Sequence, residues 1–219
     1  MKLTNLTVKY GRKTLLDNVN FTLTNRGHIV GILGQNGAGK TTLINVLLQK
    51  INKFTGEREV SESISYLPDK FFLYESMTVG QAIKLFAQAF PDFDEQRAER
   101  ILAHFGLEHS MKLHSGSKGN HEQVHLALVL ARNVDFYVMD EPLSAIDPLN
   151  RQVFIKAIEN FRRKNSTVII VTHLLRDLGE MFDDVVFMKN GQIIAMDSQA
   201  ELLEKYQNLE TAYAEVVGR

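Results

Sequence analysis

Hydrophobic and polar side chains alternate along the first part of the chain. Residues 3–8 and 19–23 show this alternation, which is typical of half-buried strands in an antiparallel sheet. A compact β-branched run at 29–33 ends in glycines, and an apolar stripe follows across 41–49. This order predicts a strand, a glycine loop and a helix, and residues 64–67 are a further candidate strand.

The middle of the chain has a helical period. Between residue 78 and about residue 132, apolar side chains share three successive faces that begin at Val79, Ile101 and Val124. Apolar runs and turn signals predict the remaining elements, which are buried strands at 136–139 and 167–171 with a helix at 148–163 between them, a hairpin at 185–196 with an Asn190-Gly191 turn, and closing helices at 198–205 and 208–217. The strand-helix-strand spacing favours a parallel sheet.

Composition narrows the class of protein. Of the 219 residues, 44% are hydrophobic and 23% are charged, which excludes disorder, collagen and coiled coil as the main state. The net charge of -1 gives no sequence-wide electrostatic case for nucleic-acid binding. The absence of cysteine excludes disulfides and thiolate chemistry. The longest apolar run has six residues, at 126–131, against about 20 for a membrane span, so we expect neither a span nor a signal peptide.

One segment carries a full phosphate-binding loop pattern. Its residues are Gly34, Gln35, Asn36, Gly37, Ala38, Gly39, Lys40 and Thr41, and Thr42 follows in the helix. Glycines let successive backbone N–H groups point at one anion, and the helix N-terminus adds positive potential. Lys40 would reach the β- and γ-phosphates of a nucleotide, and the Thr41 hydroxyl would bind Mg²⁺. The alternative is a plain glycine turn before a helix, and the position between strand and helix favours the nucleotide site.

Two later strands end in residues that suit phosphate chemistry. The run at 136–139 is followed by Asp140 and Glu141, at the edge of a parallel sheet where ligands bind. Asp140 suits Mg²⁺, and Glu141 suits the base that activates a water molecule. His173 follows the strand at 167–171, which we expect beside the first, near a γ-phosphate. Taken alone, the two acids are more commonly a strand-end cap, and a lone histidine is usually structural or solvated; the phosphate loop is what favours the catalytic interpretation.

Together these residues resemble the ATP-binding cassette (ABC) ATPases that drive transporters, over nearly the whole chain. The resemblance implies that Tyr10 stacks on adenine, although a core tyrosine at a strand end is the alternative. It also implies that Ser117, Lys118, Gly119 and Asn120 form the signature segment, which contacts the ATP of a second chain. Ser144 and Asp147 lie in the segment 144–147, which resembles the loop that crosses the dimer interface. The site would therefore be shared between two chains, as a homodimer or a heterodimer.

The sequence departs from the family pattern at several positions. Gly116 and Lys118 replace a leucine and a glycine of the signature, and Asn120 stands where glutamine is common. Asp69 occupies the position of a glutamine that touches Mg²⁺ and water; a carboxylate still binds Mg²⁺ but donates no hydrogen bond. Because of these departures, the sequence predicts nucleotide binding more firmly than it predicts fast hydrolysis.

The resemblance implies an α/β fold with a P-loop NTPase core, a mixed sheet, an N-terminal antiparallel β portion and an inserted helical subdomain. We expect a single nucleotide-binding domain over 1–219, with a catalytic core at 1–70 and 133–219 and a helical subdomain at about 71–132. The implied function is ATP hydrolysis that powers export, with ATP and Mg²⁺ bound. The chain would sit at the cytoplasmic face of the cell membrane through integral membrane subunits, without nucleic acid.

The subgroup and the mode of action have alternatives. The segment 66–69 and the Ser-Lys-Gly signature look most like short cassettes of bacterial exporters for peptide antibiotics and drugs. A soluble regulatory ATPase and a low-turnover partner in a heterodimer remain open. The aromatic residues at 71–74, with Met77 nearby, would either cradle a helix of a membrane subunit or pack the core of the helical subdomain.

Overall fold

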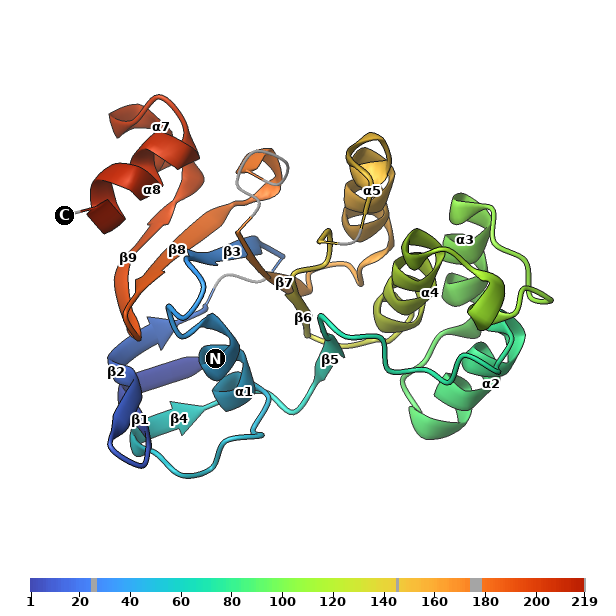
Figure 1. Cartoon of the computed structure of the whole chain (residues 1–219), viewed down its shortest axis with the longest axis horizontal. Helices are drawn as coiled ribbons and strands as arrows, with labels where there is room; N and C mark the ends of the chain where they lie inside the picture. Colours follow the sequence, from blue (N-terminus) through green and yellow to red (C-terminus); the bar gives the residue numbers. More distant parts are fainter. Residues whose placement is uncertain (25–26, 145, 174–178, 219) are drawn as a thin grey trace.

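A computed structural model shows two sheets and a separate group of helices (Figure 1). It describes residues 1–24, 27–144, 146–173 and 179–218. The first sheet has the strand order β2-β1-β4, formed by β1 (Lys2–Tyr10), β2 (Lys13–Thr22) and β4 (Thr55–Glu59). All its pairs are antiparallel, with Leu3 opposite Phe21 and Leu6 opposite Val19. The predicted antiparallel pair is therefore confirmed. The alternation rule missed β4 because the sequence of this edge strand, TGERE, is polar.

The second sheet is mixed, as predicted. Its order is β5-β6-β7-β3-β8-β9. The strands are β3 (Ile29–Gly34), β5 (Ile64–Leu67), β6 (Phe136–Asp140), β7 (Thr167–Thr172), β8 (Asp184–Lys189) and β9 (Gln192–Ser198). Neighbouring strands run parallel except for the β8–β9 hairpin. The carboxyl ends of β3, β6 and β7 consequently meet at one edge of the sheet, where ligands bind in open α/β folds.

Each face of the mixed sheet carries its own hydrophobic core. On one side α1 (Lys40–Leu47) lies between the two sheets, and its Leu43 and Ile44 pack among side chains of β1, β2, β3 and β7. On the other side lie α5 (Arg151–Phe161) and α8 (Leu209–Gly218), with α7 (Gln199–Lys205) preceding α8. Short 3-10 turns lie at Pro148–Asn150, directly before α5, and at Gly179–Met181, before β8; another, at Leu113–Ser115, precedes the helix that begins at Lys118.

The bounds of α1 and α5 differ from the pattern-based prediction. Helix α1 ends at Leu47, before residue 49, because Gln49 adopts a left-handed backbone with φ of 58°. A helix cannot continue through that conformation. The predicted helix at 148–163 is a 3-10 turn followed by α5 from Arg151. Both differences lie within the usual uncertainty of helix ends.

The helical segment of the chain forms a group of its own at one end of the molecule (Figure 1). It contains α2 (Val79–Ala89), α3 (Glu95–Phe105) and α4 (Lys118–Leu130). Thr78 and Gln81 form a reciprocal capping box at the start of α2, and Gly106 ends α3 with φ of 68°. The helical periodicity is confirmed, while the division of the chain into two subdomains stays a prediction. No helix in the described ranges is both long enough and apolar enough to span a membrane.

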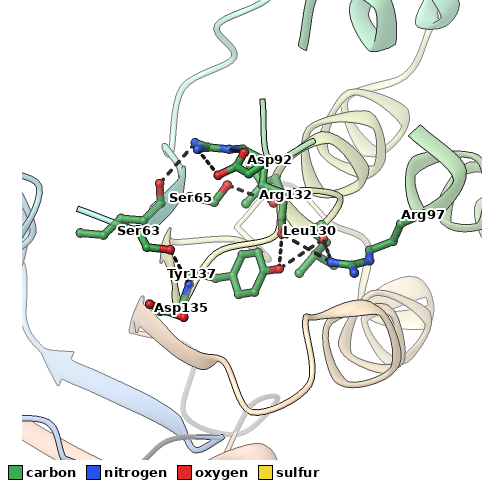
Figure 2. A network of polar contacts seen from close by, with 10 residues as sticks. Ser63, Ser65, Asp92, Arg97, Leu130, Arg132, Asp135 and Tyr137 are labelled. Atoms are coloured by element: carbon green, nitrogen blue, oxygen red, sulfur yellow. Dashed lines mark hydrogen bonds and ion pairs between the residues drawn. The ribbon is translucent and has the colours of Figure 1, made fainter. Parts of the chain in front are cut away.

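A polar network joins this helical group to the sheet (Figure 2). The Arg132 guanidinium donates two hydrogen bonds of 2.8 Å to the Asp92 carboxylate and covers the Phe90 ring at 3.9 Å. The Ser65 hydroxyl on β5 donates to the Val129 carbonyl at 3.0 Å, and the Tyr137 hydroxyl on β6 donates to the Arg132 carbonyl. The end of α4 is therefore held by two strands of the mixed sheet.

Candidate functional site

The glycine loop between β3 and α1 forms one wall of a cleft. Gly37 and Gly39 have φ of 84° and 103°, and a Cβ on Gly39 would approach the Leu15 carbonyl to 3.1 Å. Glycine is therefore required by both conformation and space. Lys40 is buried, and its Nζ donates to the carbonyls of Gly34 and Gln35 at 2.6 and 3.3 Å. The strand, loop and helix predicted for this segment are confirmed.

Three carboxylates face this loop across a cavity of about 580 Å³. They come from Asp69 after β5, Asp140 at the end of β6 and Glu141 after it. The remaining lining consists of loop and helix residues 36–42, residues 13–15 of β2, and the β8–β9 turn at 190–191. The predicted acids thus line the same cavity as Lys40, Thr41 and Thr42. This follows because the carboxyl ends of parallel strands meet at one edge of the sheet.

The acidic side chains at this cleft perturb one another. Asp140 is 8% exposed, and burial together with the charges of Asp69 and Glu141 raises its pKa to about 6; Lys40 and Lys50 act in the opposite direction. Burial lowers the pKa of Lys40, against the pull of Glu141 and Asp140. Carboxylates crowded in this way favour binding of a positive ion.

Glu141 and His173 lie in direct contact. The His173 Nδ1 is 2.8 Å from the Glu141 Oε1, and the Thr172 hydroxyl donates to Oε2 at 3.2 Å. Strands β6 and β7 are neighbours, as predicted, and this arrangement brings the two side chains together. Glu141 has φ of 51°, which is uncommon for a residue with a side chain, and its N–H donates to the Val171 carbonyl. The sequence predicted separate roles for Glu141 and His173, whereas in the structure the two side chains contact each other.

Tyr10 is 81% exposed at the end of β1. The alternative that it is a core tyrosine is therefore wrong. Its partner in the strand register is Lys13, which lines the cleft. The ring is accordingly free to contact a planar group at the cleft's rim.

The signature segment begins α4 in the helical group. Ser117 caps this helix: its hydroxyl accepts from the Asn120 N–H at 3.1 Å, and the Asn120 Oδ1 accepts from the Ser117 N–H at 3.0 Å. Ser117 and Lys118 are exposed, and Gly119 lies in the same first turn. None of these four residues is among the described residues that line the cleft. One chain alone therefore does not bring this segment to its own phosphate loop.

The segment that follows Glu141 is close to the cleft. The Ser144 N–H donates to the Glu141 carbonyl at 3.1 Å, and the Asp147 carbonyl accepts from Asn150 at 2.9 Å. Both Ser144 and Asp147 are exposed. Ala145 lies outside the described residues.

Sequence reasoning missed several groups at the site. Residues 13–15 of β2 and the turn at 190–191 line the cleft, and the Gly191 N–H donates to the Ala38 carbonyl at 2.9 Å. The Asn-Gly signal predicted this turn, but only the sheet order places it beside the loop. Lys50 lies with its Nζ 4.3 Å from the centre of the Tyr66 ring, and no local signal marks it. Glu122 is also perturbed: burial and the charge of Asp69 raise its pKa to about 7.

For the aromatic segment at 71–74 the alternatives were contact with a membrane subunit and packing of the helical group, and each fits a part of the segment. Phe71 is partly buried and stacks on His121 and His125 at 4.4 and 4.3 Å, and Leu73 is buried. Phe72 and Tyr74 are 42% and 76% exposed. Part of this segment therefore packs the helical group, and part faces solvent.

A glycine loop between a parallel strand and a helix, opposed by acids at neighbouring strand ends, defines a P-loop nucleoside triphosphate-binding protein. A family model described as "ABC transporter" matches residues 16–144. The chain belongs to this family, whose members are the ATP-binding and ATP-hydrolysing subunits of transporters.

Relatives and solved structures agree with this family. An uncharacterized ABC transporter ATP-binding protein of Methanocaldococcus jannaschii is 31% identical over 216 residues, covering 96% of this chain and 82% of its own. The tungstate uptake system ATP-binding protein TupC of Peptoclostridium acidaminophilum is 34% identical over 203 residues, covering 86% and 94%. A solved structure described as an ATP binding subunit of an ABC transporter superposes with a TM-score of 0.84 at 23% identity, covering 99% and 98%.

Proposed function

We propose that the chain binds ATP with Mg²⁺ in the cleft, closes as a dimer on two nucleotides, and hydrolyses them to power export through separate membrane subunits. The observation that supports this most is the convergence of the phosphate loop, Asp140 and Glu141 on one cavity. Export is favoured by the Ser-Lys-Gly signature and the segment 66–69. TupC belongs to an uptake system, so the direction of transport needs its own test.

Binding would use the loop and its flanks. The N–H groups of residues 34–41 and the Lys40 ammonium would hold the phosphates, with Thr42 beside them, and Tyr10 would stack on the base. Lys40 must exchange its present bonds to the Gly34 and Gln35 carbonyls for phosphate oxygens. Because it is buried and its pKa is lowered, the ammonium gains from an anionic partner.

A magnesium ion fits the donor set of this cleft. The described residues include no cluster of three or more His, Cys, Asp or Glu side chains that would hold a metal by themselves. Mg²⁺ is usually held by one or two carboxylates together with substrate phosphates. Asp140, the Thr41 hydroxyl and Asp69 supply such oxygens. When bound, the ion would neutralise charge on the phosphates.

Glu141 would act as the base for hydrolysis. A water oxygen would attack the γ-phosphorus and pass its proton to the Glu141 carboxylate. The bond between the γ-phosphorus and the bridging oxygen would break, and its electron pair would stay on that oxygen of the leaving ADP. In the free chain this carboxylate is occupied by His173 and Thr172. With a nucleotide bound, His173 would exchange this contact for the γ-phosphate, and the Glu141 carboxylate would accept the proton of the water.

The remaining residues would serve a second chain. Ser117, Lys118, Gly119 and Asn120 are exposed or partly exposed and lie apart from the chain's own cleft. Their helix N-terminus suits the γ-phosphate of a partner's nucleotide. Ser144 and Asp147 would cross the interface. Phe72 and Tyr74 would contact a helix of the membrane subunit, which would hold the chain at the cytoplasmic face of the membrane.

ATP turnover by four purified forms tests the site. We expect Lys40→Ala to lose nucleotide binding, and Glu141→Gln to keep binding while turnover falls at least about a hundredfold. Glu204→Gln, on the exposed face of α7, is the matched control and should behave as wild type. Equal rates for Glu141→Gln and wild type would contradict the assigned base. A wild type that binds ATP without measurable turnover would favour the low-turnover partner of a heterodimer.

Assembly and partners need separate measurements. In light scattering with ATP, Glu141→Gln should form a dimer, and adding Ser117→Arg should return it to a monomer. Affinity purification from detergent-solubilised membranes should recover a multi-span membrane protein in stoichiometric amount. Recovery of ribosomal or DNA-bound partners instead would contradict the transporter role and favour the soluble regulatory ATPase. Vesicles reconstituted with the recovered subunit would give the direction of transport.

A further inference from the structure

On the side that faces α8, opposite the nucleotide cleft, the phosphate loop borders a second cavity. A cavity of about 280 Å³ is lined by loop residues 35–38, by residues 188–190 at the end of β8 and in the turn after it, and by Tyr213 and Val217 of α8. Residues 36–38 line this second cavity and also the nucleotide cleft. The loop therefore lies between the two cavities. A group that binds the loop from the α8 side also affects the position of the backbone that faces the phosphates.

Helix α8 is held in a fixed place relative to this loop. The Tyr213 ring packs edge-on against Phe187 of β8, with ring centres 5.5 Å apart, and the Lys189 ammonium donates to the Val217 carbonyl at the end of the helix. Strand β8 in turn pairs with β3 up to Gly34, where the loop begins. Tyr213 is thus attached to the same sheet that carries the loop.

The Tyr213 hydroxyl is an unsatisfied polar group. Its oxygen is buried and makes no well-formed hydrogen bond within the described residues. Burial raises the pKa of the Tyr213 phenol, and the backbone N–H of Gln35, which is directed toward it, opposes that change. A buried hydroxyl without a good partner is costly and usually has a function. Gln35, the first loop residue after Gly34, lines the same cavity as Tyr213.

We propose that Tyr213 is a positioning residue for the phosphate loop: its hydroxyl oxygen accepts a hydrogen bond from the Gln35 backbone N–H when the loop closes on a nucleotide. This inference rests on the proposed function. Gly37 and Gly39 adopt positive φ angles that glycine reaches without strain, and the bond would fix the first residue of the loop. A bond that is better formed in the bound state favours that state, so α8 would raise nucleotide affinity.

Tyr213→Phe tests this directly, because it removes the hydroxyl and keeps the ring against Phe187. We expect the dissociation constant for ATP with Mg²⁺ to rise about two- to twelvefold, the range for one hydrogen bond. Tyr206→Phe, after α7, is the matched control and should bind as wild type. The melting temperature without nucleotide should be no lower for Tyr213→Phe than for wild type, because the hydroxyl that is removed has no well-formed partner there. In wild type, nucleotide should slow hydrogen exchange of α8, and Tyr213→Phe should lose that protection.

Several results would overturn the inference. One is a dissociation constant for Tyr213→Phe less than twofold above wild type. Another is weaker binding accompanied by an equal loss of stability without nucleotide, which would show a structural role only. Lys40→Ala in the same assay separates the two proposals: if wild type binds ATP and Lys40→Ala does not, an unchanged Tyr213→Phe refutes only the role of Tyr213. A wild type that binds no nucleotide would refute both.

Discussion

Glu122 offers a sharp test of the electrostatics around the cleft. It lies in α4, next to the signature turn, and burial together with the charge of Asp69 raises its pKa from the ordinary 4.5 to about 7. The charged form is therefore disfavoured in the folded chain. Glu122→Gln keeps the size and polarity of the side chain and removes the charge. It should therefore stabilise the protein at pH values where the Glu122 carboxyl loses its proton.

The sign and size follow from proton linkage. Below about pH 4.5 the carboxyl is protonated in both states and contributes no difference. As pH rises toward 7, the unfolded chain ionises first, so the stability of the wild type falls, and above about pH 7 the penalty is constant. Between about pH 5.5 and pH 8.5 the penalty grows by at most about 2 kcal/mol. Because the side chain is only partly buried, we expect a change of about 1–2 kcal/mol.

Urea denaturation at both pH values measures this change. The free energy of unfolding of Glu122→Gln, relative to wild type, should increase by that amount from the lower to the higher pH. Glu204→Gln, on an exposed face of α7, should show no such trend. Asp69→Asn should reduce the effect, because one cause of the raised pKa of Glu122 is removed. A difference between Glu122→Gln and wild type that is independent of pH would refute the reasoning.

Three further predictions concern packing and the polar network, each measured by urea denaturation. Arg132→Leu leaves the Asp92 carboxylate without its two 2.8 Å bonds and should cost about 1–3 kcal/mol; no loss would show that the network does not hold the helical group. Gly31→Ala places a Cβ 2.7 Å from the Phe182 ring and should cost about 1–3 kcal/mol through overpacking, so an unchanged midpoint would contradict the tight contact. Tyr137→Phe removes the hydroxyl that donates to the Arg132 carbonyl and should cost about 1–2 kcal/mol, whereas a stabilised variant would contradict that bond.

The sequence by itself determined the local units and their chemistry. Strand, glycine loop and helix follow one another without a break at 29–49, so the spacing alone predicts a phosphate-binding loop. The acids at 140 and 141 and the histidine at 173 each follow an apolar run, and parallel strands carry such ends to one edge. These inferences succeed because contiguous residues and the period of their side chains fix secondary structure locally.

The tertiary structure decided which of these units touch. The polar strand β4 forms only because β1 offers it an edge, and the sheet order places β3 between β7 and β8, which brings the 190–191 turn to the loop. The contact of Glu141 with His173 and the cavity shared by Gln35 and Tyr213 also join distant parts of the chain. Hydrophobic burial is non-directional, so an apolar pattern states that a face is buried but not against what. That choice is made by the packing of the whole chain.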